Sequence, residues 1–109
     1  MQTYLHATAT LKPMRPSEAL QNHITAIRSA IHQHHTTNPR VFGSVLAGTD
    51  RDGSDLDLLV DPLPETTLFD LGGLQIELEA LLGVPVDVQT PGDLPVQIRA
   101  RILAEARPL

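Results

Sequence analysis

The sequence predicts an α/β fold: a small mixed sheet of three to four strands with helices on one face. Apolar stripes with helical spacing alternate along the chain with short aliphatic runs, in the order helix, strand, strand, helix, strand, helix. Proline, glycine and aspartate residues separate these runs, as is typical of turns. At 109 residues the chain is the size of one domain, which buries roughly two-thirds of its unfolded surface without disulfides or structural metal.

The N-terminal half is expected to contain one amphipathic helix that begins near Ser17. Its apolar stripe has spacings of four, three and four and consists of Leu20, Ile24, Ile27 and Ile31. Polar residues and a proline between positions 36 and 39 are expected to end this helix. Residues 3–11 alternate between apolar and polar side chains, which is consistent with an edge strand or an extended arm. We therefore divide the chain into an N-terminal arm, residues 1–14, and a domain, residues 15–109.

Three strands and two more helices are expected after this first helix. The strands are predicted at residues 40–42, 56–60 and 84–88, each bounded by turn residues. A leucine stripe over residues 68–81 predicts a helix that Gly72 and Gly73 weaken. Asp93 is expected to cap a last helix that carries Leu94, Ile98 and Ile102.

Carboxylates on the second strand are the first candidates for chemistry. Because side chains alternate along a strand, Asp55 and Asp57 are expected on the face opposite Leu56, Leu58 and Val60. Such a pair can bridge two divalent ions roughly 3.5–4 Å apart, as in two-metal nucleotidyl transfer. Hard oxygen ligands suit Mg²⁺ or Mn²⁺ better than zinc or copper.

Two further features extend this candidate site. Asp87 interrupts a run of valines in the third strand, where an unpaired buried carboxylate would be costly. If that strand neighbours the second, Asp87 joins the pair, with binding a metal and accepting a proton as its candidate roles. Gly43 and Ser44 directly follow the first strand, where glycine permits close backbone approach and free N–H groups can face an anion.

Composition and charge exclude several classes of function. The net charge is −5 and Lys12 is the only lysine, so a general DNA- or RNA-binding surface is not expected. No cysteine is present, which removes thiol catalysis, zinc thiolate sites and disulfides. No apolar run approaches the roughly 20 residues that cross a bilayer, and no signal peptide is recognised, so a cytoplasmic protein is expected. Five aspartates between positions 50 and 61 face Arg51 alone, which favours a bound divalent cation over a solvated acidic loop.

Other charged clusters receive weaker interpretations. The segment 50–61 faintly matches a calcium-binding loop but has Asp55 where that loop requires glycine. Three histidines at a helix end, His32, His34 and His35, are explained by the negative end of the helix dipole. Near the C-terminus, three arginines are interpreted as a solvated face, with contact to a partner or a phosphate as the alternative. These are Arg99, Arg101 and Arg107.

The pattern as a whole resembles the DNA polymerase beta-like nucleotidyltransferase superfamily. It consists of Gly43-Ser44, ten intervening residues, Asp55-Leu56-Asp57 at the start of a strand, and Asp87 in a later strand. The short length resembles the minimal branch, the MNT proteins. The resemblance implies that Gly43, Ser44 and Ser54 bind the nucleotide. It also implies that the three aspartates are catalytic and bind Mg²⁺, with two ions expected.

The same resemblance implies a partner. Larger members of the superfamily carry a second domain for the acceptor, for which this chain has no room, so the acceptor is expected on another polypeptide. Similarity to the MNT branch implies a HEPN-type toxin, an antitoxin role, and transfer of AMP from ATP to a tyrosine of that toxin within a hetero-oligomer. Two alternatives stay open: a non-catalytic antitoxin that acts by binding, and a small-molecule nucleotidyltransferase. Base preference and stoichiometry are left undetermined.

Overall fold

A four-stranded mixed sheet organises the computed structural model, which describes residues 14–109. Its strands are β1 (Thr36–Phe42), β2 (Leu56–Pro62), β3 (Val86–Gln89) and β4 (Arg107–Pro108). The order across the sheet is β3-β2-β1-β4, with β2 and β3 parallel and the other two pairs antiparallel. The predicted α/β class and mixed sheet are confirmed, whereas the alternation at residues 3–11 lies outside the described residues.

The N-terminal stripe forms two helices instead of the one predicted. They are α2 (Pro16–Asn22) and α3 (Ile24–Gln33), separated at His23. The backbone of His23 leaves the helical region, and its ring Nδ1 lies 2.9 Å from the carbonyl oxygen of Ala19. This side-chain contact gives a helical carbonyl a partner at the break, which apolar spacing alone does not reveal.

Residues 36–39 were expected to end a helix, and this was wrong because they form the first half of β1. The turn between α3 and β1 needs only His34 and His35, the latter at a φ of 59°. Thr36 is then buried, and its hydroxyl donates to the carbonyl of Ile31 over 2.8 Å. Asn38, at a φ of 53°, coincides with a register shift in the β1–β2 pairing, which accommodates polar residues within the strand.

Helix α5 (Leu68–Leu82) connects the parallel strands β2 and β3. Thr67 caps it by accepting a hydrogen bond from the Asp70 N–H, and the left-handed Gly83 ends it. Gly72 and Gly73 are accommodated without a break. At Gly73 an added Cβ would lie 3.2 Å from the His34 ring, so a small residue suits the approach of α3 to α5. The third strand begins at Val86, two residues later than predicted.

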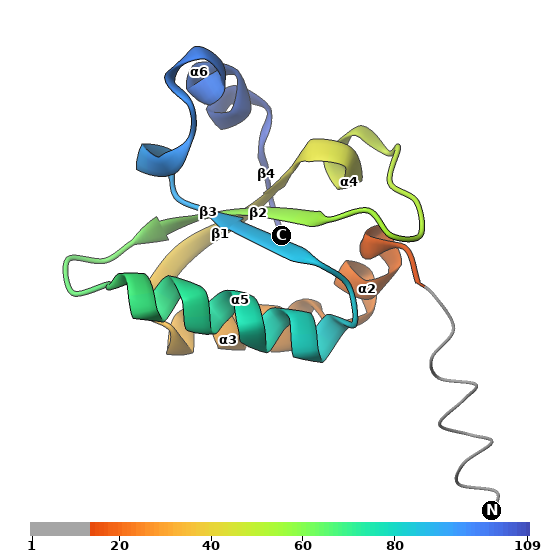
Figure 1. Cartoon of the computed structure of the whole chain (residues 1–109), viewed down its shortest axis with the longest axis horizontal. Coiled ribbons are helices and arrows are strands. Elements are labelled where there is room, and N and C mark those ends of the chain that lie inside the picture. Colours follow the sequence, from red (N-terminus) through yellow and green to blue (C-terminus); the bar gives the residue numbers. More distant parts are fainter. Residues whose placement is uncertain (1–13) are drawn as a thin grey trace, which may run out of the picture.

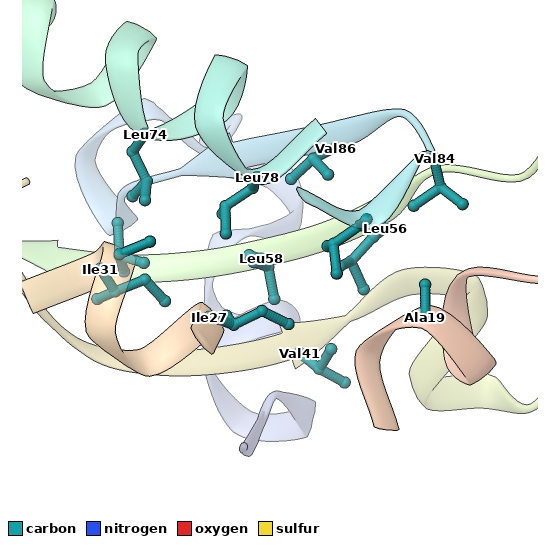
Figure 2. Packing of buried hydrophobic residues seen from close by; sticks show 13 residues of the cluster. Ala19, Ile27, Ile31, Val41, Leu56, Leu58, Leu74, Leu78, Val84 and Val86 are labelled. Carbon is teal, nitrogen blue, oxygen red and sulfur yellow. The ribbon is translucent and has the colours of Figure 1, made fainter. Parts of the chain in front are cut away.

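One face of the sheet carries most of the core. Helices α2, α3 and α5 cover it, and Figure 1 shows α3 and α5 side by side below the strands. Leucines and isoleucines of these helices pack on inward residues of β2 and β1, including Leu56, Leu58 and Val41 (Figure 2). Within residues 14–109, no helix has the length and apolarity needed to cross a membrane.

The last helix lies on the opposite face, which corrects the expectation that helices cover one face alone. Helix α6 (Val96–Glu105) lies on the side of the sheet away from α3 and α5 (Figure 1), and its Ile102 packs in one cluster with the fully buried Leu59. Asp93 was predicted to cap this helix, and this prediction was wrong because the N-cap residue is Pro95. Asp93 lies in a 3₁₀ turn (Pro91–Asp93), where its carboxylate accepts a hydrogen bond from the Thr90 hydroxyl over 2.8 Å. Helix α6 therefore begins after Pro95.

Candidate functional site

Strand β2 separates core residues from the candidate site. Leu56, Leu58 and Val60 are fully buried against the helices on one face. Asp57 is half-buried on the other face, and Asp55, just before the strand, is exposed. The alternation of side chains along β2 therefore places Asp57 on the face that α2, α3 and α5 leave open.

The sheet register brings a second carboxylate beside Asp57. In the parallel pairing of β2 with β3, Asp57 and Asp87 are direct partners. Paired residues of adjacent strands project to the same face, so Asp87 shares the open face with Asp57. The Gln89 side-chain amide, two residues along β3, donates to the Asp87 carboxylate over 2.9 Å and gives one of its oxygens a fixed partner. The sequence-based condition that these strands are neighbours is therefore met.

The electrostatics at Asp57 follow from this placement. Burial, together with the charges of Asp87 and Asp55, raises the pKa of Asp57 to about 6. Desolvation and like charge both oppose ionisation of a carboxylate. The ionised form of Asp57 is therefore destabilised at this position, and a bound cation or proton would relieve the repulsion between the carboxylates.

Gly43 brings the backbone up against the Asp57 carboxylate. It begins the short helix α4 (Gly43–Ala47), directly after β1, at a φ of 73°. A Cβ at this position would collide with Asp57 Oδ2 and lie 3.0 Å from Asp57 Cγ. Both the left-handed backbone and the missing side chain are thus required here. Ser44, the next residue, is half-buried at the start of α4.

The open face fits a hard divalent cation in the chemistry of its donors. Asp57 and Asp87 supply carboxylate oxygens on adjacent strands, next to a glycine whose missing side chain leaves room for the Asp57 carboxylate. Among residues 14–109, no three histidine or acidic side chains form a ready-made metal site. Asp57 and Asp87 are register partners on adjacent strands, whereas Asp55 is exposed and lies just before β2.

Two other aspartates of the acidic segment are not part of this site. Asp50 is buried and accepts the Ser17 N–H of α2 over 2.9 Å, and this hydrogen bond lowers the pKa of Asp50. Asp61 pairs with Arg40 at 2.7 Å and also accepts a hydrogen bond from Asn38. The density of aspartates between positions 50 and 61 therefore has local structural causes in addition to the site.

Ser54, predicted to bind the nucleotide, has a visible role in the turn before β2. Its hydroxyl accepts the Arg51 N–H over 2.9 Å, and its own N–H donates to the Arg51 carbonyl over 3.0 Å. These bonds set the entry of the chain into β2 and hence the position of Asp55 and Asp57.

Sequence reasoning missed a cavity of about 720 Å³ between α4 and α6. Gly43 and Ala47 line one side, and Arg101 and Glu105 line the other. The apolar spacing of α6 was recognised from the sequence, but spacing does not specify which face of a sheet a helix covers. No signal in the sequence therefore indicated that this helix forms a wall of the candidate site.

Comparison with known proteins places these features in a family. A family model described as "Nucleotidyltransferase domain" matches residues 24–109. A protein of Methanocaldococcus jannaschii named "Putative protein adenylyltransferase" is 36% identical over 74 residues, covering 68% of this chain and 80% of that protein.

Three solved structures have a fold similar to that of this chain. A structure described as a "putative minimal nucleotidyltransferase" is 42% identical, with a TM-score of 0.77 over 85% of this chain and 95% of the other. A toxin–antitoxin complex with AMP-PNP is 18% identical, with a TM-score of 0.64 over 80% of this chain and 69% of that one. A mutant of the toxin–antitoxin pair MntA-HpeT is 13% identical, with a TM-score of 0.63 over 77% and 69%. At these last two identities the likeness concerns the fold alone.

Proposed function

The chain belongs to the family of nucleotidyltransferase domains, and on that premise we propose that it transfers AMP from ATP to a hydroxyl group of a partner protein. The oxygen of the hydroxyl attacks the α-phosphorus, and the bond from that phosphorus to the bridging oxygen of the β-phosphate breaks. Pyrophosphate leaves with the electron pair of that bond. The products are the adenylylated partner and pyrophosphate.

The observation that carries this proposal is the register of Asp57 against Asp87, next to a glycine that admits no side chain. Asp57 and Asp87 would hold Mg²⁺, and Asp55, being exposed, would join them by rotation of its side chain. The bound ions, two by the expectation from sequence, would neutralise charge on the phosphates and on the carboxylates. Asp87 would accept the proton of the attacking hydroxyl.

Gly43, Ser44 and Ser54 are the proposed nucleotide-binding residues. The Gly43 backbone approaches Asp57 more closely than any other residue type would allow. Phosphates held there would lie against the carboxylates that bind the cation. Positioning of the nucleotide and neutralisation of its charge supply most of the rate in this class of reaction.

A toxin is the proposed partner, and the chain its antitoxin. Support comes from the two toxin–antitoxin structures that share the fold, and from the sequence resemblance that implied a HEPN-type toxin and a tyrosine acceptor. We further propose that the catalytic unit is residues 15–109, with residues 1–14 as an arm.

A second candidate is an antitoxin that neutralises its toxin by binding alone. Two adjacent apolar side chains favour a protein-binding surface: Leu68 is 83% exposed and Phe69 is 90% exposed at the start of α5. Binding through such a surface needs no chemistry at Asp57.

Incubation with the partner, Mg²⁺ and ATP separates the two candidates. We expect the partner to gain the mass of one or more adenylyl groups, and Asp57→Asn and Asp87→Asn to abolish this gain. Asp52→Asn, an exposed aspartate of the preceding loop, serves as a matched control and should leave labelling unchanged. A partner that is inhibited without a mass change, equally by all variants, would support binding alone and contradict the transfer.

A further inference from the structure

The cavity between α4 and α6 borders the proposed site at Gly43. Gly43 lines it, and the same glycine lies against the Asp57 carboxylate. Figure 1 shows α4 and α6 on the same side of the sheet, away from α3 and α5. The sheet order places the cavity toward β1 and β4, whereas Asp87 lies on β3 at the other side of Asp57. A ligand that spans the open face thus meets carboxylates at one end and this cavity at the other.

The two walls of the cavity differ in charge. The α4 wall, from Gly43 to Gly48, contains no charged residue. The opposite wall presents Arg101 and Glu105 of α6, and Arg107 follows at β4. The cations among the residues that line this cavity are therefore Arg101 and Arg107, both on the C-terminal wall.

Arg101 is available for a ligand, unlike several other arginines. Its side chain is 68% exposed, and its recorded contact within residues 14–109 is a long ion pair of 3.9 Å with Glu105. Arg99, two residues earlier, instead donates to the carbonyls of Gly92 and Leu94. Arg28 is bound to the Leu109 carbonyl, and Arg40 to Asp61. Of these four arginines, Arg101 is held by a weak surface ion pair alone, and breaking that pair costs little free energy.

We propose that Arg101 binds the polyphosphate of the nucleotide in the cavity between α4 and α6. This proposal rests on the proposed function and assigns to α6 the cation that α4 lacks. A guanidinium binds phosphate oxygens through two parallel N–H donors, which fixes the orientation of the group as well as its charge. Mg²⁺ held by Asp57 and Asp87 at one end and the Arg101 guanidinium at the other would give the polyphosphate a cation at each end and orient it toward β1.

Glu105 should affect phosphate binding in the opposite direction to Arg101. It lines the same cavity and lies beside the Arg101 guanidinium, so its negative charge opposes an incoming phosphate. Removal of the Glu105 charge should therefore tighten binding, whereas removal of the Arg101 charge should weaken it. A merely structural role of α6 would not produce effects of opposite sign.

Calorimetric titration with ATP, pyrophosphate and AMP in the presence of Mg²⁺ tests the proposal on the full chain. We expect Arg101→Gln to raise the Kd for ATP and pyrophosphate about tenfold, equivalent to about 1.4 kcal/mol. The Kd for AMP should change little. Glu105→Gln should lower the Kd for ATP and pyrophosphate. Arg51→Gln, an exposed arginine that does not line the cavity, is the matched control and should leave all three constants unchanged.

Each alternative outcome has one interpretation. If ATP binds the wild-type chain and Asp57→Asn alters that binding, but Arg101→Gln does not, the assignment of Arg101 is wrong and the proposed function stands. An equal loss of affinity for AMP in Arg101→Gln would also overturn it, because the arginine would then contact a different part of the nucleotide. If no nucleotide binds the wild-type chain with Mg²⁺ present, the proposed function itself fails.

Discussion

At the scale of single residues, the negative charge of Asp57 on the open face lowers the stability of the folded protein. Its pKa, raised to about 6 by burial and by Asp87 and Asp55, exceeds the value of about 3.8 expected in the unfolded chain. The folded state therefore binds a proton more tightly than the unfolded state. Ionisation of Asp57 costs stability above pH 6, and the cost disappears as the pH falls toward 4.

This imbalance makes a prediction for Asp57→Asn in metal-free protein. We expect the variant to be more stable than wild type at pH 7, by about 1 kcal/mol after allowance for partial exposure. The gain should vanish near pH 4, where the wild-type carboxyl is protonated. Chemical denaturation at both pH values in the presence of a chelator measures it, with Asp52→Asn as the unaffected control. A variant destabilised at pH 7 would show that Asp57 is a structural residue.

Gly43 makes a second prediction at the same scale. Gly43→Ala should lower the free energy of unfolding by more than the roughly 1 kcal/mol that a left-handed alanine costs, because its Cβ would also displace the Asp57 carboxylate. Gly48→Ala is a matched control: Gly48 has a φ of 76° at the other end of α4, but no atom lies near its missing Cβ. Equal losses in the two variants, measured by urea denaturation, would contradict the close approach of Gly43 to Asp57.

At the scale of elements, Asp50 fixes the loop that leads into β2. Its carboxylate accepts the Ser17 N–H at the first turn of α2, a contact between segments 33 residues apart in the chain. Asp50→Ala should lower stability by about 1–3 kcal/mol, since the partly buried Ser17 N–H loses its partner. Thermal unfolding measures this loss, and Asp50→Asn should recover part of it because an amide oxygen can still accept.

The lowered pKa of Asp50 gives this element a pH dependence opposite to that of Asp57. The folded state binds the Asp50 proton less tightly than the unfolded state, so its stabilisation is present above pH 4 and is lost as the pH falls further. An Asp50→Ala variant with wild-type stability would show that the loop is held by other contacts.

Some of the helices and strands could be predicted from the sequence, and others could not. The alternation of β2 and the valine run of β3 predicted both strands, because burial of one face leaves a period of two in the sequence. The parallel pairing of β2 with β3 could be expected because a helix, α5, lies between them in the sequence. The break at His23 and the start of β1 at Thr36 depend on single side-chain hydrogen bonds, which leave no periodic pattern. The face covered by α6 is a tertiary choice for the same reason.

At the scale of the whole molecule, the sheet has two unlike faces. One is covered by α2, α3 and α5 and supplies most of the core, and on the other side lie α4 and α6, of which α6 packs on Leu59 (Figure 1). Asp57, Asp87 and Gly43 were predicted as site residues, and the sheet register places them together. The cavity wall from α6 was not predicted, because it depends on how elements distant in sequence pack across the open face.

The most direct test of the central claim follows the fate of the two ends of ATP. With the partner and Mg²⁺ present, we expect label from the α-phosphate to appear on the partner, and label from the γ-phosphate to leave as pyrophosphate. Asp57→Asn and Asp87→Asn should abolish the transfer of the α-label, while Asp52→Asn retains it. Transfer of the γ-label, or transfer of the α-label undiminished in the Asp57 and Asp87 variants, would contradict nucleotidyl transfer at this site.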